Sequence, residues 1–267
     1  MKKLFTLFAL AILSLAGANA QVLVDWNLIV SENFSGVAAG TAITTSNTSL
    51  DYARAATGAG NGVLEARNSS VLGKAAYMSS DSNSITGIGS YGLDSFSVGK
   101  LSFDFNIVNP TSGTNLFFGM GDGSNWSSNS SFNTNEMTMG MSIDGTTLLS
   151  RSSSGSGSWN PMITDLVVET KFSLSLVFNN SGKQISYDGG CLLSDGYADV
   201  WLDDTLIGTV ALTHGMDATA FRIYATNSAY EIANVQLFVP TFPIPEPSTW
   251  LLLGIGAASI VVFRRRK

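Results

Sequence analysis

Carboxylate side chains are the residues of this sequence with the clearest potential for catalysis, because retaining glycoside hydrolysis needs two of them about 5 to 5.5 Å apart. On one β-strand, such a pair requires carboxylates two or four residues apart. Glu136 is followed by no carboxylate before Asp144, and the sequence contains no Glu-x-Asp-x-x-Glu element. Asp199 and Asp203 share a face of a regular strand, but a polar outer face explains them equally well. The sequence therefore predicts no catalytic residues and no enzyme.

The chain contains one cysteine, Cys191, and one histidine, His214. A single cysteine cannot form an intrachain disulfide, so stability must come from a buried core. Cys191 follows two glycines and precedes two leucines, which is typical of a half-buried thiol, and His214 precedes a glycine in a predicted turn. Neither a Cys-His nucleophile nor a zinc site is supported.

Gly-, Ser- and Asn-rich segments hold the residues that could bind a ligand. Asp122, Ser124 and Asn125 could offer oxygen ligands to Ca²⁺, but the segment lacks the EF-hand pattern and a plain Gly-Asp-Gly turn also explains it. Asp122 is therefore a Ca²⁺ candidate, and no other metal or cofactor is expected. Trp126 and Trp159 could stack on a sugar ring if exposed; indoles folded back over the domain edge are the alternative.

Apolar and polar residues alternate along most of the middle of the chain, with the period of half-buried β-strands. The pattern is clearest at residues 101–107, 137–143 and 172–178, with Phe103 and Leu174 on apolar faces and Ser102 and Ser173 on polar ones. Further strands are predicted at 22–30, 63–66, 116–120, 198–202, 206–212, 221–224 and 230–239, and loops at 79–92, 124–135 and 152–158. Each sheet must bury its apolar side, so residues 21–242 are predicted to form an all-β, two-sheet antiparallel jelly-roll sandwich.

The first 20 residues have the three parts of a secretory signal peptide. Lys2 and Lys3 form the positive start, residues 4–16 form the apolar segment, and Ala18-Asn19-Ala20 is an A-x-A cleavage site. Gln21 is therefore the predicted mature N-terminus, and a retained N-terminal anchor is the alternative.

Charge is unevenly distributed along the chain. Six of the 14 Lys and Arg lie in the two ends, whereas none of the 20 Asp and Glu lies in 1–20 or 248–267. The middle consequently carries a net charge of −12, against −6 for the whole chain. Such a field repels nucleic acid, and also anionic polysaccharide unless cations intervene, so we expect no nucleic-acid partner.

The end of the chain joins a proline-bounded motif, an apolar segment and a basic terminus. Pro245, Glu246 and Pro247 form a stiff hinge, because proline disfavours helical geometry in the residue before it. Residues 250–263 would form a transmembrane helix of about 21 Å, shorter than the roughly 30 Å of a bilayer core. The basic terminus, which favours the cytoplasmic side, consists of Arg264, Arg265, Arg266 and Lys267. A buried core helix is the alternative, but it would place four cations beside a core.

These three parts resemble the PEP-CTERM protein-sorting domain of Gram-negative bacteria, over residues 243–267. The resemblance implies that Pro245, Glu246 and Pro247 are recognised by an exosortase, a membrane-embedded cysteine transpeptidase that cuts near the motif. It further implies delivery to the envelope surface, and it says nothing directly about the middle domain.

Segments of the middle domain are similar to laminin-G-like, or concanavalin A-like, jelly-roll domains. The similar segments are 32–36, 39–41, 101–105, 116–123 and 198–204, and Asp203-Asp204 suits the hairpin turn expected at the end of the last one. The resemblance implies a fold and no activity, because functional sites are grafted onto folds.

Together these observations predict an exported, non-enzymatic protein of the cell envelope or extracellular matrix, membrane-anchored until processed, that binds exopolysaccharide weakly. The expected partners are exosortase, signal peptidase and the export machinery, the membrane through the C-terminal helix, and exopolysaccharide. A surface adhesin that contacts protein and a secreted glycan hydrolase are the alternatives.

Overall fold

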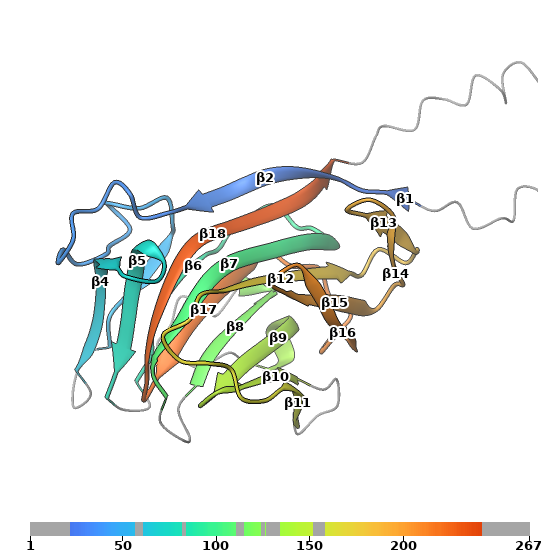
Figure 1. The fold of residues 1–267 in the computed structure, drawn as a ribbon. Helices are drawn as coiled ribbons and strands as arrows, with labels where there is room; N and C mark the ends of the chain where they lie inside the picture. Colours follow the sequence, from blue (N-terminus) through green and yellow to red (C-terminus); the bar gives the residue numbers. More distant parts are fainter. Residues whose placement is uncertain are drawn as a thin grey trace, which may run out of the picture.

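The computed structural model describes residues 22–56, 61–81, 84–110, 115–123, 126, 134–151 and 158–241. They form an all-β protein in which two large antiparallel sheets pack face to face, which confirms the predicted sandwich (Figure 1). No helix in these ranges is long and apolar enough to cross a membrane. The predicted signal peptide at 1–20 and transmembrane helix at 250–263 lie outside the described residues.

The two large sheets have eight and seven strands. The first runs β16 (Thr205–Ala211), β15 (Tyr197–Leu202), β12 (Phe172–Asn179), β7 (Val98–Asn109), β18 (Ala229–Thr241), β5 (Gly73–Ser80), β4 (Gly62–Ser69), with β2 (Asp25–Glu32) also paired to β18. The second runs β11 (Trp159–Ile163), β10 (Thr147–Arg151), β9 (Met137–Asp144), β8 (Asn115–Gly121), β17 (Ala220–Thr226), β6 (Thr86–Ser90), β3 (Tyr52–Arg54).

The core lies between these sheets and follows the predicted alternation. Phe103 of β7 and Leu174 of β12 are buried in it, whereas Ser102 and Ser173 lie on the opposite face. Across the core, the Phe103 ring meets the Phe118 ring of β8 edge-on at 5.2 Å. Each such burial stabilises the fold by about 1.5 to 3 kcal/mol, so a core of this size is sufficient without a disulfide.

The N-terminal segment departs from the single strand predicted at 22–30. It divides into two strands, β1 (Val22–Leu23) and β2. Only β2 pairs with β18, whereas β1 pairs in parallel with β13 (Ile185–Tyr187). β13 also pairs with β14 (Cys191–Leu193), which creates a third, three-stranded sheet. Val24, at the point of division, is buried in the cluster beneath this small sheet.

The loop predicted at 79–92 contains a buried strand, β6. Its sequence, Thr-Gly-Ile-Gly-Ser, reads as a loop because two glycines flank a single apolar residue. The glycines are required by close packing: a Cβ on Gly87 would lie 2.5 Å from the Tyr224 Cβ, and one on Gly89 would lie 2.4 Å from the Phe221 carbonyl oxygen. Tertiary packing on β17 therefore decides this strand, and local propensity does not.

Candidate functional site

The outer face of the eight-stranded sheet carries polar side chains from several adjacent strands. Alternation along β12 turns Ser173, Ser175 and Val177 away from the core. Register places Ser175 beside Trp201 of β15, and Val177 beside Lys100 of β7. Three adjacent strands thus present an indole, hydroxyls and an ammonium group on one face.

The small sheet covers one half of this face. Tyr187 of β13 and Leu193 of β14 pack on Val177 and Val98, and Trp26 and Trp201 lie at the margin of the cluster. Apolar contact therefore seals this half and leaves the other half open.

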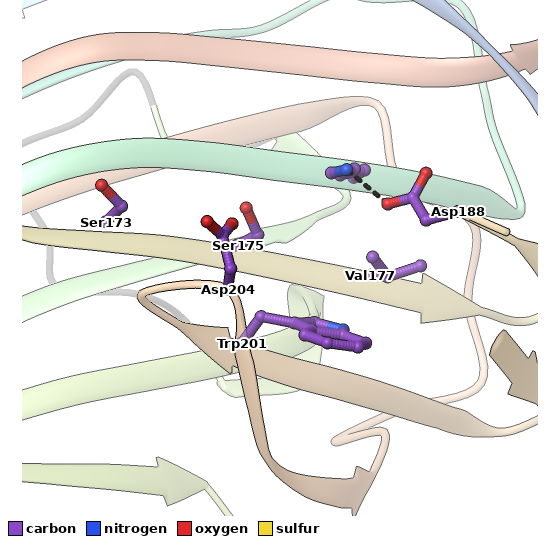
Figure 2. Close-up of a pocket in the computed structure, with 7 residues that line it drawn as sticks. Ser173, Ser175, Val177, Asp188, Trp201 and Asp204 are labelled. Carbon is purple, nitrogen blue, oxygen red and sulfur yellow. Dashed lines mark hydrogen bonds and ion pairs between the residues drawn. The ribbon is translucent and has the colours of Figure 1, made fainter.

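A groove of about 260 Å³ remains where the cover ends. Its lining residues are Lys100, Ser173, Ser175, Val177, Asp188, Trp201 and Asp204. Figure 2 shows Ser173, Ser175 and Val177 along one strand, with Trp201 and Asp204 beside them and Asp188 opposite. The volume is slightly below the roughly 300 to 1,000 Å³ of pockets that enclose drug-sized molecules, so the groove suits one small ring.

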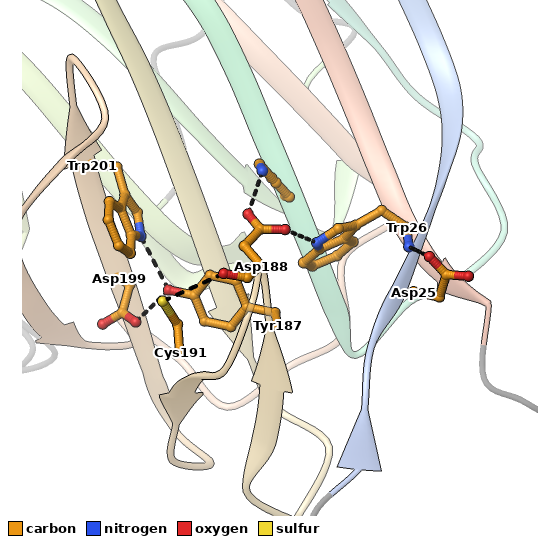
Figure 3. A network of polar contacts seen from close by, with 8 residues as sticks. Asp25, Trp26, Tyr187, Asp188, Cys191, Asp199 and Trp201 are labelled. Carbon is orange, nitrogen blue, oxygen red and sulfur yellow. Dashed lines mark hydrogen bonds and ion pairs between the residues drawn. The ribbon is translucent and has the colours of Figure 1, made fainter.

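Asp188 holds the small sheet against the large one at the edge of the groove. Its Oδ2 lies 2.6 Å from the Lys100 Nζ, and its Oδ1 accepts a hydrogen bond from the Trp26 Nε1 at 2.8 Å. Both carboxylate oxygens are thus engaged, and three chain segments meet at one residue (Figure 3).

A second set of polar contacts fixes the orientation of Trp201. Its Nε1 donates to the Tyr187 hydroxyl at 3.0 Å, and that hydroxyl donates to the Asp199 Oδ2 at 2.5 Å. Asp199 as a residue is 3% exposed, and its other carboxylate oxygen accepts a hydrogen bond from the Thr209 hydroxyl. Burial raises the pKa of the Tyr187 hydroxyl above its ordinary value, and the hydrogen bond to Asp199 raises it further. Tyr187 therefore stays a donor to Asp199 at neutral pH.

The charge of the groove limits what it can bind. Lys100 contributes one positive charge, and Asp188 and Asp204 contribute two negative ones. Hydroxyl, carboxylate and ammonium groups around an indole can hydrogen-bond the hydroxyls of a neutral ring while the indole covers an apolar face. A carboxylated ring would meet net negative charge there.

The carboxylates weighed for hydrolysis are not brought together as a pair. Asp199 is buried against Tyr187, whereas Asp203 lies in the hairpin turn between β15 and β16. Asp203 and Asp204 both have positive φ, 48° and 61°, as expected for the predicted two-residue hairpin turn. The Asp203 carboxylate accepts from the Ser173 backbone N–H at 2.8 Å, so its role here is to hold the turn.

Trp126 does not have the exposed indole that stacking on a sugar requires. The side chain is 1% exposed and packs with Ile85, Met137 and Tyr224 on the outer face of the seven-stranded sheet. Its carbonyl accepts a hydrogen bond from the buried Arg222 guanidinium at 3.1 Å. This is the folded-back alternative, and it leaves no open ring face for a ligand.

Trp159 is half-buried on edge strand β11. Its ring lies 5.7 Å from that of Phe117, and the Arg151 guanidinium lies 5.2 Å from its centroid. Unlike Trp126, it retains part of its surface for a ligand.

The remaining candidates are scattered. Asp122 follows β8, and its backbone N–H bonds to the Glu136 carbonyl at 2.8 Å; Ser124 and Asn125 lie outside the described residues. No group of three or more His, Cys, Asp or Glu that could hold a metal occurs in the described ranges. Cys191 is half-buried in β14. The sorting residues Pro245 to Pro247 and Arg264 to Lys267 lie outside the described residues as well.

The sequence prediction missed the groove residues Lys100, Asp188 and Trp201. Trp201 could have been found from its alternation with buried Val200 and Leu202, which leaves the indole on the outer face. Lys100 carries the same signal, because it alternates with buried Leu101 and shares the outer face with Ser102. Asp188 lies in a turn and carries none, and its ion pair with Lys100 forms only when the small sheet docks.

Comparison with known families identifies the C-terminal segment. Residues 243–267 match the PEP-CTERM protein-sorting motif. The chain carries a PEP-CTERM sorting signal. This confirms the prediction made from Pro245, Glu246 and Pro247, and it indicates an exosortase-processed protein of the cell surface.

The solved structures that match this chain are distant from it in sequence. Domain 4 of the arabinanase AbnA from Geobacillus stearothermophilus is 15% identical, with a TM-score of 0.47 over 82% of this chain and 95% of that one. Carbohydrate-binding module CBM66 from Bacillus subtilis is 14% identical, with a TM-score of 0.39 over 66% and 90%. A sialidase is 11% identical, with a TM-score of 0.44 over 62% of this chain and only 15% of the sialidase. A sequence comparison with curated proteins finds no match.

Proposed function

We propose that this chain is an exported surface or extracellular-matrix protein of a Gram-negative bacterium, and that its sandwich is a non-enzymatic module that binds a neutral sugar residue of exopolysaccharide. A signal peptide at 1–20 would direct export, and the helix at 250–263 would anchor the chain until exosortase processes it. The observation that carries the binding proposal is the groove beside Trp201.

Three properties of the groove support a sugar as ligand. Trp201 is only part-buried and its N–H is already bound by Tyr187, so its ring is held in place before a ligand arrives. Such preorganisation reduces the entropy lost on binding. Ser173, Ser175 and Asp204 line the same groove as the indole and offer hydroxyl and carboxylate groups to the hydroxyls of a sugar.

The non-enzymatic part of the proposal rests on how the carboxylates are used. Asp188 is bound by Lys100 and Trp26, and Asp199 by Tyr187 and Thr209. Each is engaged through both oxygens in holding the sheets. Among the described residues that line the groove, Asp204 is therefore the one carboxylate without such contacts, and it has no second unengaged carboxylate in that lining to act with it.

The test is a glycan array, followed by affinity electrophoresis on the polysaccharide that binds. Trp201→Ala should weaken retention about tenfold or more, which corresponds to roughly 1.4 kcal/mol. Leu206→Ala is the matched control, because Leu206 pairs with Trp201 in the same hairpin, is 45% exposed and does not line the groove. Equal retention of wild type and Trp201→Ala would exclude this groove, and release of labelled sugars from polysaccharide would overturn the non-enzyme assignment.

A protein-binding adhesin is the second candidate, and one observation favours it. Leu23 and Leu192 are 66% and 55% exposed, and both neighbour Ser186 in the small sheet, on the side away from the large one. Two exposed leucines on either side of one residue suit a protein contact. Loss of surface adhesion in Leu23→Ser with an unchanged glycan profile would favour this candidate over the groove.

A further inference from the structure

The outer face of the seven-stranded sheet carries a row of aromatic rings separate from the groove. The Phe117 ring stacks on that of Tyr224 at 4.9 Å and lies 5.7 Å from that of Trp159. Arg151 of β10 pairs in register with Trp159 of β11, so the guanidinium and the indole are neighbours at the end of this row.

Arg151 differs from Arg67 and Arg222, whose side chains are both engaged by other residues. Arg67 is ion-paired with Glu65 at 2.6 Å, and the buried Arg222 donates to the Trp126 carbonyl and the Tyr52 hydroxyl. Within the described residues, by contrast, the Arg151 side chain makes neither an ion pair nor a hydrogen bond, and its Nε is buried.

The partly buried Arg151 guanidinium is energetically unfavourable without a bound anion. Burial lowers the pKa of its guanidinium, and Tyr224 opposes that effect. Arginine nevertheless stays protonated at neutral pH, so a charge is partly removed from water without a counter-ion. A ligand carboxylate would supply two acceptors for the planar N–H fork.

We propose that Arg151, Trp159 and Phe117 form a second binding site, selective for a carboxylated sugar residue. The guanidinium takes the carboxylate, and the aromatic surface beside it takes the apolar side of the sugar ring. The site lies on the opposite outer face from the groove and has the opposite charge preference. The net charge of −12 does not prevent this, because charges more than about 8 Å away are largely screened at physiological salt.

The experiment compares tetragalacturonic acid with its methyl ester, measured by calorimetry on the full chain in detergent. Wild type should bind the acid at least tenfold more tightly than the uncharged ester. Arg151→Gln should lose about tenfold to a hundredfold of the affinity for the acid, since hydrogen bonds to charged groups are worth that much. Arg67→Gln is the matched control, because its guanidinium is occupied by Glu65 and also covers the Tyr77 ring.

Further variants separate this site from the groove and from a folding defect. Trp201→Ala should leave binding of the acid unchanged, so failure of the groove proposal would not affect this result. Arg151→Lys keeps the charge without the fork and should fall between wild type and Arg151→Gln. Equal affinity for acid and ester, an equal loss in Arg67→Gln, or wild-type affinity in Arg151→Gln would each overturn the proposal, and tighter binding of a sulfated tetrasaccharide would show that the site selects a different anion.

Discussion

Trp201 donates its indole N–H to the hydroxyl of Tyr187 across 3.0 Å, although the two residues belong to different sheets. The Tyr187 hydroxyl in turn donates a hydrogen bond to the buried Asp199 carboxylate, which fixes the position of that hydroxyl (Figure 3). The ring that lines the groove is therefore oriented by an element of only three short strands. One of those strands is the first described segment of the chain.

Tyr187→Phe should destabilise the fold and loosen the groove. The substitution removes one hydroxyl that bonds both Trp201 and Asp199, and it leaves a buried carboxylate oxygen unsatisfied. We expect a loss of about 1 to 3 kcal/mol in urea unfolding. Tyr197→Phe is the control, since Tyr197 is 44% exposed, and it should change stability by less than about 0.5 kcal/mol. Equal effects of both variants would contradict the role given to the network.

The protein should lose stability at alkaline pH. Burial raises the pKa of Tyr91, Tyr187 and Tyr230 above the ordinary value of 10.0. The folded state therefore holds protons that the unfolded chain releases above about pH 10, so this stability is complete below pH 10 and lost as pH rises. Urea unfolding between pH 8 and 11.5 measures the slope, and Tyr187→Phe should flatten it. A pH-independent midpoint would refute the prediction.

Adjacent residues of β7 should respond in opposite ways to a new charge. Phe103→Asp would place an unpaired carboxylate between the sheets and unfold the domain, whereas Ser102→Asp faces outward and should be tolerated. Ser173→Asp should cost about 1 to 3 kcal/mol despite facing outward, because Ser173 donates to Asp104 at 2.6 Å and the new carboxylate would repel it. Thermal melting of the three variants gives the order.

The two tryptophans predicted to bind sugar should differ in stability. Trp126→Ala removes a buried side chain and should cost about 3 to 5 kcal/mol. Trp159→Ala truncates a half-buried ring on an edge strand and should cost less, while weakening binding of the carboxylated probe. A larger stability loss in Trp159→Ala would show that its ring is the structural one.

Processing at both ends should be visible in the mass of the protein recovered from the envelope. The predicted product begins at Gln21 and lacks the segment from Arg264 to Lys267. Deleting Pro245 to Pro247 should block the second cut and retain the basic terminus. Recovery of an intact chain from Met1 to Lys267 in wild-type cells would contradict sorting.

Local patterns in the sequence were sufficient to predict the β class, the core faces and the sorting signal. Alternation placed Phe103 and Leu174 inside and Ser102 and Ser173 outside, because side-chain direction in a strand depends only on parity along the chain. The PEP-CTERM motif is a contiguous segment, so no fold was needed to read it.

Other features depend on residues that are distant in the chain. β6 forms because its glycines let β17 approach closely. The division of the N-terminal segment at Val24 is decided by the pairing of β1 with β13, some 160 residues later in the chain. Trp126 and Trp159 have similar neighbours in the sequence, yet one is buried against Tyr224 and the other keeps an open side beside Arg151. Asp188 reaches Lys100, and Tyr187 reaches Trp201, only through docking of the small sheet. An ion pair and an indole hydrogen bond between distant segments are specified by tertiary contact and leave no periodic trace in the sequence.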